Sequence, residues 1–167
     1  SLTAGLGGTI ALYTGGVADS TGLSDLVGSG SGNFRYNTDI DADGTVTSGY
    51  TRALSANVIN ALYRQQPTVT VTPVKNSIVY GDTTPQSYTA GFNGRVNGDA
   101  ASEFIGDVAW TTTANGTSST GFLQAGVAQH ALCIDITNLS NALGYAMAVV
   151  CSAKLTVQAA SGRKAED

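Results

Sequence analysis

Charged residues are scarce in this chain of 167 residues, which has 8 Lys and Arg, 12 Asp and Glu and one histidine. Lys and Arg do not cluster outside the tail pair Arg163 and Lys164, so the basic surface that attracts nucleic acid or an anionic membrane is missing. No apolar run approaches the roughly 20 residues that span a bilayer. We therefore expect neither nucleic-acid binding nor membrane insertion.

The chain also lacks the residue groupings of a catalytic site. His130, the single histidine, forms no recognisable local signature with a nucleophile and a carboxylate. The glycines at 28–32 precede a predicted strand, whereas a phosphate-binding turn precedes a helix. An enzyme is therefore the least expected class. The start lacks Met and a basic, apolar leader, which we expect of a fragment of a longer exported protein.

Glycine is abundant, with 21 residues, and Thr, Ser, Ala and Val are frequent. This composition favours short strands and turns over amphipathic helices. We predict an all-β protein with two small antiparallel domains at 1–66 and 67–158, followed by a disordered tail at 159–167. The stretch "AASEFIG" is the one place in the second domain where we expect a short helical turn.

Alternating apolar residues predict the individual strands. They occur in "GTIALYTG", "GNFRYN", "TVTVT", "DVAWTT", "TGFLQA", "QHALCIDITNL" and "YAMAVVCSAKLTV". The stretches "NSIVYGD" and "SYTAGF" are predicted to form a β-hairpin. Residues 50–63 fit two patterns, because apolar residues recur every four positions as in a helix, whereas "VINALYR" alternates as a strand. We favour the strand slightly.

The stretch "DIDADGTV" has the alternating carboxylates of a calcium loop, at Asp39, Asp41 and Asp43. An EF-hand-type loop also needs a bidentate carboxylate at its twelfth position, which here is Tyr50. Without that group the stretch predicts a solvated turn between strands. A weak calcium site at the three aspartates is the alternative.

Two cysteines, Cys133 and Cys151, lie in predicted strands, so an oxidising compartment would allow them to pair. Such a disulfide closes a loop worth about 3 kcal/mol by chain-entropy arguments. The alternation of "HALCIDI" puts Cys133 opposite the apolar face of Leu132 and Ile134, whereas Cys151 shares a face with apolar neighbours. Pairing therefore needs a bulge or an outer face that is itself covered, and two free buried thiols are the alternative.

Two Asn-X-Ser/Thr triplets, at Asn115 and Asn138, fall in turn-like surroundings that would tolerate a glycan.

Aromatic residues suggest a carbohydrate-binding function as an alternative. Exposed Tyr13, Tyr36 or Tyr88 would line a shallow groove of a carbohydrate- or glycoprotein-binding domain.

Residues 67–158 resemble the MBG module of the YGX type, which occurs in very large bacterial surface adhesins. The resemblance rests on turn motifs and aromatic residues in a fixed order: "VYGD" at Val79–Asp82, Pro85, Tyr88, "VNGD" at Val96–Asp99, Tyr145 and "LTV" at Leu155–Val157. The preceding segment is similar to the one before this module in filamentous-haemagglutinin-like and high-molecular-weight-adhesin-like exoproteins of the two-partner secretion pathway. An immunoglobulin-like or β-grasp-like fold is expected for the module.

The resemblance implies a non-enzymatic module in the C-terminal region of a secreted or surface-attached adhesin, serving adhesion, stalk or anchoring. Its partners would be a host-surface glycoprotein or glycan, or the outer-membrane export pore, and no cofactor is expected. Some such adhesins are tethered by a cysteine pair near the C-terminus, a role that Cys133 and Cys151 would fill. Modules of this type usually lack cysteine, so a disulfide that only stabilises this copy is the alternative. Some carry hexoses on Asn-X-Ser/Thr sites, which implies the same for Asn115 and Asn138.

Overall fold

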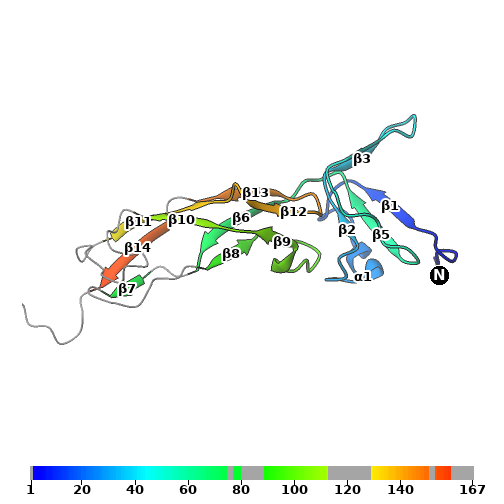
Figure 1. Ribbon diagram of the computed structural model, residues 1–167. Coiled ribbons are helices and arrows are strands. Elements are labelled where there is room, and N and C mark those ends of the chain that lie inside the picture. Colours follow the sequence, from blue (N-terminus) through cyan, green and yellow to red (C-terminus); the bar gives the residue numbers. More distant parts are fainter. Residues whose placement is uncertain (1, 75–76, 80–88, 113–128, 151–152, 159–167) are drawn as a thin grey trace, which may run out of the picture. The chain divides into compact units, whose positions relative to one another are not determined.

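The computed structural model describes residues 2–74, 77–79, 89–112, 129–150 and 153–158 (Figure 1). Short strands dominate these residues, which confirms the predicted all-β class. Their helices are α1 (Leu23–Val27) and a single 3₁₀ turn, η1 (Ala101–Glu103), which lies where "AASEFIG" predicted one. None of the described helices has the length and apolar character needed to cross a membrane.

The chain folds into two compact units, each assembled from separate stretches. Unit 1 comprises Ser1–Val69, Phe92–Gly106 and Leu139–Ala148, and unit 2 comprises Thr70–Gly91, Asp107–Asn138 and Val149–Asp167. Unit 1 thus combines the N-terminal segment with two later stretches of the chain. The predicted domain boundaries after residues 66 and 158 are not tested by this division and stay a prediction.

A three-stranded sheet in unit 1 has the order β1-β5-β2, formed by β1 (Ile10–Thr14), β5 (Ile59–Tyr63) and β2 (Phe34–Arg35). Strand β5 is central, and its residues 60–63 are fully buried, so the preference for a strand in the ambiguous stretch is confirmed. Both pairings are parallel, however, and the antiparallel prediction is wrong here. Apolar alternation defines the faces of a strand but not the direction of its neighbour.

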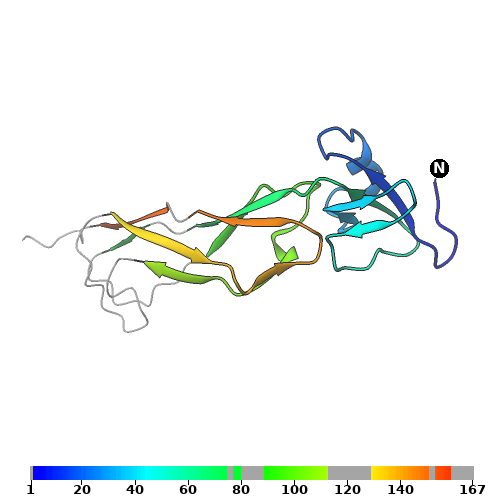
Figure 2. The same ribbon diagram turned by 90° about the horizontal axis from the view of Figure 1, so that it is seen from above.

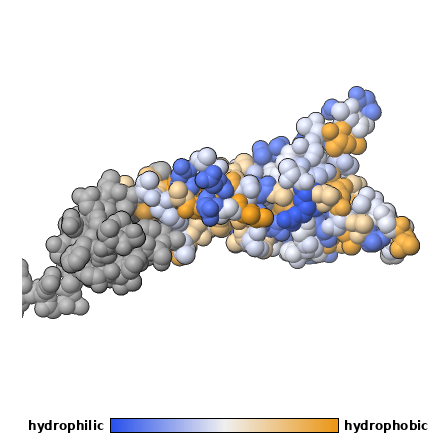
Figure 3. Space-filling view, viewed as in Figure 1, coloured by the Kyte–Doolittle hydropathy of each residue, from blue (hydrophilic) through white to orange (hydrophobic). Residues whose placement is uncertain are grey.

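A separate hairpin carries the aspartate-rich stretch. Strands β3 (Thr38–Ile40) and β4 (Val46–Ser48) pair antiparallel, and the hairpin projects away from the β1-β5-β2 sheet of the same unit (Figure 1). Figure 2 shows the same unit from above. Its base is buried, because Thr38 is only 2% exposed, whereas residues 40–49 are exposed. Figure 3 shows hydrophilic residues at its tip and an apolar patch below them. The exposed large apolar residues of this hairpin are Ile40 and Val46, which pair with each other.

The remaining strands form three further sheets. A four-stranded sheet has the order β10-β11-β14-β7, formed by β10 (Ala109–Thr112), β11 (Gln129–Asp135), β14 (Ala153–Gln158) and β7 (Ser77–Val79). A two-stranded sheet has the order β12-β9, formed by β12 (Leu139–Asn141) and β9 (Phe104–Gly106). A three-stranded sheet has the order β13-β6-β8, formed by β13 (Ala146–Val149), β6 (Thr68–Pro73) and β8 (Ala90–Asn93).

The hairpin predicted from "NSIVYGD" and "SYTAGF" is wrong for the described residues. Strand β7 pairs with β14 in parallel, whereas β8 lies beside β6. The backbone N–H of Val74 donates to the carbonyl of Thr89 at 2.8 Å, so the chain entering β8 aligns with the end of β6. The immunoglobulin-like or β-grasp-like assignment stays a prediction.

Candidate functional site

Aromatic side chains from three distant stretches meet in the core of unit 1. The ring of Tyr36, just after β2, lies 5.6 Å from the ring of Tyr63 and 4.6 Å from that of Tyr145. The ring of Phe104 also packs against that of Tyr145, with 5.4 Å between the ring centroids. Tyr36 is 0% exposed, so its hydroxyl group needs a polar partner inside the protein. The hydroxyl of Tyr63 is also buried, and it has no hydrogen-bond partner among the described residues.

Asp99 supplies the central partner. Its Oδ2 atom accepts hydrogen bonds from the hydroxyls of Tyr36 at 2.6 Å and Tyr145 at 2.7 Å. The side chain of Asn97 donates to the Tyr36 hydroxyl at 3.0 Å, and the backbone N–H of Val96 donates to the Tyr145 hydroxyl at 3.0 Å. The turn at 96–99 is thereby joined to two tyrosines that are far away in the sequence. We call Tyr36, Asp99 and Tyr145 the tyrosine–aspartate cluster.

Burial sets the electrostatics of this cluster. Asp99 is only 3% exposed, and its burial raises the pKa of its carboxyl, against the two tyrosine hydrogen bonds that lower it. Burial, together with the neighbouring Asp99, also raises the pKa of Tyr36 well above its ordinary range. Burial is likewise the main cause of a raised pKa at Tyr145. The hydroxyls therefore remain protonated donors, which is the state that the hydrogen bonds need.

Two glycines permit the close packing around the cluster. Gly144 has φ +103°, and a Cβ there would overlap the backbone carbonyl of Tyr36. The backbone N–H of Tyr36 donates to the carbonyl of Leu143 at 2.8 Å. Gly98 has φ +73°, and a Cβ there would lie 2.8 Å from the backbone nitrogen of Gly30. The N–H of Gly30 donates to Asn97 at 2.9 Å. The glycine-rich stretch near residue 30 therefore packs against the turn at 96–99.

A buried arginine holds the neighbouring backbone. The guanidinium of Arg35, which is 0% exposed, donates to four backbone carbonyls, those of Gly32, Phe34, Arg52 and Ala53, at 2.7 to 3.1 Å. Next to it, Arg52 forms an ion pair with Glu103 at 2.6 Å. Arg35 therefore fixes loops of unit 1, as expected for a buried charge whose donors are satisfied, whereas Arg52 and Glu103 are only partly buried.

An open pocket of about 340 Å³ lies beside the cluster, lined by Phe92, Asn93, Gly94, Arg95, Gly98 and Asp99. Arg95 donates to the backbone carbonyls of Phe92 and Asp99, so it shapes the turn. Asp99 Oδ1 is buried and accepts no hydrogen bond from the described residues.

Residues 69–156, more than half of the chain, match the MBG domain (YGX type) family. The chain belongs to this family. MBG domains occur in extracellular surface proteins, and the match indicates an adhesin-type module. Searches of the curated proteins and of the solved structures found no match.

The MBG match contains two of the three members of the cluster. Asp99 closes the "VNGD" turn and Tyr145 follows Gly144, whereas Tyr36 lies in the segment before the match. The N-terminal segment therefore contributes a buried side chain to the packing of the MBG turn. Sequence reasoning identified the "VNGD" turn and Tyr145 as family features, but not their contact with Tyr36.

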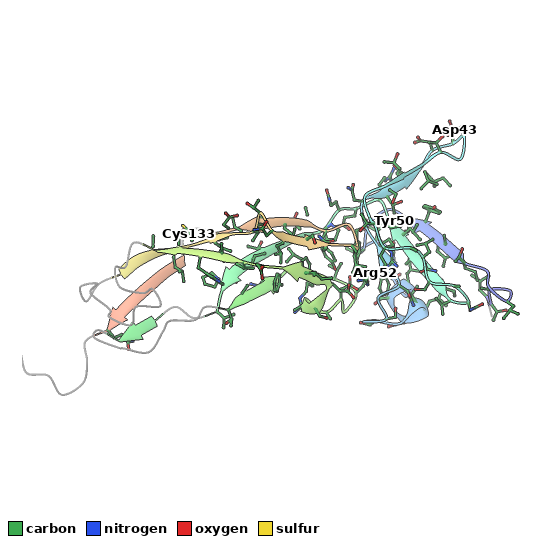
Figure 4. All side chains as sticks on the ribbon, in the orientation of Figure 1. Asp43, Tyr50, Arg52 and Cys133 are labelled. Carbon is green, nitrogen blue, oxygen red and sulfur yellow. The ribbon has the colours of Figure 1, made fainter. Side chains whose placement is uncertain are left out.

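The three aspartates of the predicted calcium loop lie on the β3–β4 hairpin. The N–H of Thr45 donates to Asp43 at 2.9 Å, which lowers the pKa of Asp43, and Asp39 faces Arg64 at 3.8 Å. Figure 4 shows Asp43 at the tip of the hairpin and Tyr50 at its base. The loop therefore does not close around its twelfth position. Among the described residues, no group of three or more His, Cys, Asp or Glu is arranged to hold a metal ion.

We expect calcium to leave the unfolding temperature unchanged. The carboxylates of Asp41 and Asp43 are exposed, and the hairpin is already closed by the backbone hydrogen bond from Asp41 to Thr45 at 2.9 Å. Differential scanning calorimetry with added calcium and with chelator measures this, with Asp43→Asn as the comparison. An unfolding temperature that rises with calcium in the native chain, but not in Asp43→Asn, would support the calcium alternative.

The cysteines are described only in part. Cys133 is half-buried in β11 opposite Thr111, and the predicted alternation is confirmed, because Leu132 and Ile134 are buried while Asp135 is exposed. Cys151 lies outside the described residues, so the disulfide stays a prediction. The β11–β14 ladder pairs Leu132 with Ala153. In an unbroken antiparallel ladder, residue 152 and not Cys151 would oppose Cys133, so a disulfide requires the ladder to end at this pair.

The other predicted site residues have different positions. Asn138 is exposed in the turn between β11 and β12, as predicted, whereas Asn115 lies outside the described residues. Tyr36 is fully buried and cannot line a groove, which corrects its assignment to an exposed aromatic surface. Tyr13 is 37% exposed on β1, and Tyr88 lies outside the described residues. Glycosylation stays a prediction.

Raised tyrosine pKa values predict a loss of stability at alkaline pH. An unfolded tyrosine releases its proton near its ordinary pKa of 10.0, whereas Tyr36 and Tyr145 keep theirs in the folded protein. The folded state then binds more protons, so the free energy of unfolding falls as the pH rises above 10.0. Urea unfolding at a series of alkaline pH values measures the slope. An equally steep loss in Tyr36→Phe would show that Tyr36 does not contribute.

Proposed function

We propose that this chain is a non-enzymatic structural module of a large secreted bacterial surface adhesin, where it acts as a stalk or as an anchor at the cell surface. The observation that supports this best is the use of the buried polar groups. Asp99, Arg35 and the cluster tyrosines bind other parts of the protein and hold distant stretches together. Oδ1 of Asp99 accepts no hydrogen bond from the described residues, but the residue is only 3% exposed and its other oxygen is held by the two tyrosine hydroxyls.

The wider context of the proposal comes from the resemblance to two-partner-secretion exoproteins. In that context the parent adhesin leaves the cell through an outer-membrane pore, and this module contacts the pore or a host-surface glycoprotein or glycan. No cofactor takes part in this function. A carbohydrate-binding groove has less support, because Tyr36, one of its three proposed aromatic residues, has no exposed surface.

Deleting the module from its parent adhesin tests the proposal. We expect the cell-associated fraction of the parent protein to fall and the released fraction to rise, as measured by immunoblotting of cells and medium. Beads coated with the isolated chain test direct adhesion to host cells and to a glycan array. Unchanged surface retention, together with specific glycan binding by the beads, would contradict a stalk or anchor and favour a binding domain.

We also propose that Cys133 and Cys151 form a disulfide that stabilises this end of the chain. Alkylation of the secreted protein before and after reduction, followed by mass spectrometry, measures the pairing. We expect two alkyl groups to be added only after reduction, and the same spectra report any hexose at Asn115 or Asn138. Alkylation of both cysteines without reductant in material from the cell surface would contradict the disulfide and the tether.

A further inference from the structure

The first strand of unit 1 is held by a long parallel seam. Five residue pairs join β1 to β5, from Ile10 with Ile59 to Thr14 with Tyr63. The seam extends beyond both strands. At its start the N–H of Asn57 donates to Gly8 at 2.7 Å, and at its end the N–H of Gln65 donates to Gly15 at 3.0 Å. It therefore runs from about the eighth to the fifteenth residue of the chain.

Side chains reinforce both ends of this seam. The side-chain oxygen of Asn57 accepts from the N–H of Gly7 at 2.7 Å, and that of Gln65 accepts from the N–H of Val17 at 2.7 Å. In the middle, the buried side chain of Asn60 donates to the carbonyl of Ile10 at 3.3 Å. Strand β1 is at the edge of its sheet, so among the described residues its only strand pairing is with β5.

Strand β5 is fixed from its other side. It is the central strand of the sheet and pairs in parallel with β2. Arg35 of β2 in turn binds the backbone carbonyls of Gly32 and Ala53. Residues 60–63 of β5 are fully buried. A force on the chain would therefore separate the edge strand β1 from β5 before it removed β5 from the core.

We propose that the β1–β5 seam is a mechanical clamp that resists tension applied along the chain. Tension draws β1 toward its N-terminal end and β5 toward its C-terminal end. Because the strands are parallel, these directions are opposite along one shared axis, so the seam is loaded in shear and its hydrogen bonds share the force. The same bonds would break one after another if both strands were pulled from the same end.

The second unit repeats this arrangement. Strand β14, the last strand described, pairs in parallel with β7, in the register Thr156 with Ser77 and Gln158 with Val79. It lies between β11 and β7, so tension on its C-terminal end loads both of its neighbours along the strand direction. The parallel pair thus includes the first described strand, β1, in unit 1 and the last described strand, β14, in unit 2. The source of tension in the cell rests on the proposed stalk or anchor function, whereas the mechanical property does not.

Single-molecule force spectroscopy on the full chain tests the clamp. Handles are attached at introduced cysteines in a background in which Cys133 and Cys151 are serine. The shear pair is Leu6→Cys with Arg64→Cys, and the peeling pair is Leu6→Cys with Val58→Cys. All three sites are exposed, and only the loaded end of β5 differs between the two pairs. We expect the force that detaches β1 to be several-fold higher with the shear pair.

A matched pair of proline variants tests the ladder itself. The N–H of Arg64 donates to Thr14, so in a regular parallel ladder the N–H of Leu12 faces β5 and that of Tyr13 faces the free edge. Leu12→Pro should lower the shear force several-fold and Tyr13→Pro should largely preserve it. Equal forces in the two pulling geometries, or equal losses in the two proline variants, would overturn the clamp. Neither result would affect the retention test of the proposed function.

Discussion

Gly144→Ala is expected to lower the free energy of unfolding by about 3 kcal/mol or more, because backbone strain and overpacking each cost up to a few kcal/mol. The backbone of Gly144 has φ +103°, which a residue with a Cβ rarely adopts. The new methyl group would also overlap the carbonyl of Tyr36. Backbone on both sides is held by hydrogen bonds, including Tyr36 to Leu143 at 2.8 Å, so neither side moves away easily.

Gly44→Ala is the matched control for this prediction. Gly44 has φ +86° at the hairpin tip, and a Cβ there meets no atom within 4 Å. The control therefore has the backbone strain without the overlap and should lose only about 1 kcal/mol. Urea unfolding of both variants, followed by tyrosine fluorescence and circular dichroism, measures the difference. Equal losses in the two variants would show that the contact between Gly144 and Tyr36 is not as close as the structure has it.

Asp99→Ala is expected to have the second large effect, a loss of about 2 to 4 kcal/mol, because buried donors that lose a charged acceptor cost more than the net value of a hydrogen bond. The hydroxyls of Tyr36 and Tyr145 both lose their acceptor. The truncation also leaves a cavity beside residues that are fully buried. Near-ultraviolet circular dichroism should report looser packing of the tyrosines.

Asp99→Asn separates the hydrogen bonds from the charge. An amide oxygen can accept from both hydroxyls, and the substitution removes a buried carboxylate whose pKa is raised by its burial. We therefore expect Asn to retain most of the stability that Ala loses. Equal destabilisation by Ala and Asn would contradict the role of Asp99 as a hydrogen-bond acceptor, and no effect of Ala would contradict the cluster.

Much of the fold follows from the sequence, because short-range patterns determine it. The alternation in "GTIALYTG" and "TVTVT" corresponds to β1 and β6, and "AASEFIG" contains the 3₁₀ turn. The direction of the strands was missed. Alternation specifies which side chains share a face, whereas the parallel pairing of β1 with β5 depends on the path of the chain between them.

The tyrosine–aspartate cluster was missed for a different reason. An aspartate after "NG" is typical of a solvated turn, and nothing near Asp99 in the sequence indicates that it is 3% exposed. Its burial results from Tyr36, which is 63 residues away. The three alternating aspartates attract attention because their pattern is local. In the structure they lie on an exposed hairpin, and Asp99 is the buried carboxylate among the residues that the structure describes.

A double-mutant cycle between Tyr36→Phe and Asp99→Ala in the full chain is the most direct test of the account. In the structure, the segment before the MBG match is bound to the MBG turn through a buried hydrogen bond of 2.6 Å between Tyr36 and Asp99. We predict a coupling energy of about 1 to 2 kcal/mol between Tyr36 and Asp99, as residues in one hydrogen-bond network usually show. Additive effects, with a coupling below about 0.5 kcal/mol, would contradict it.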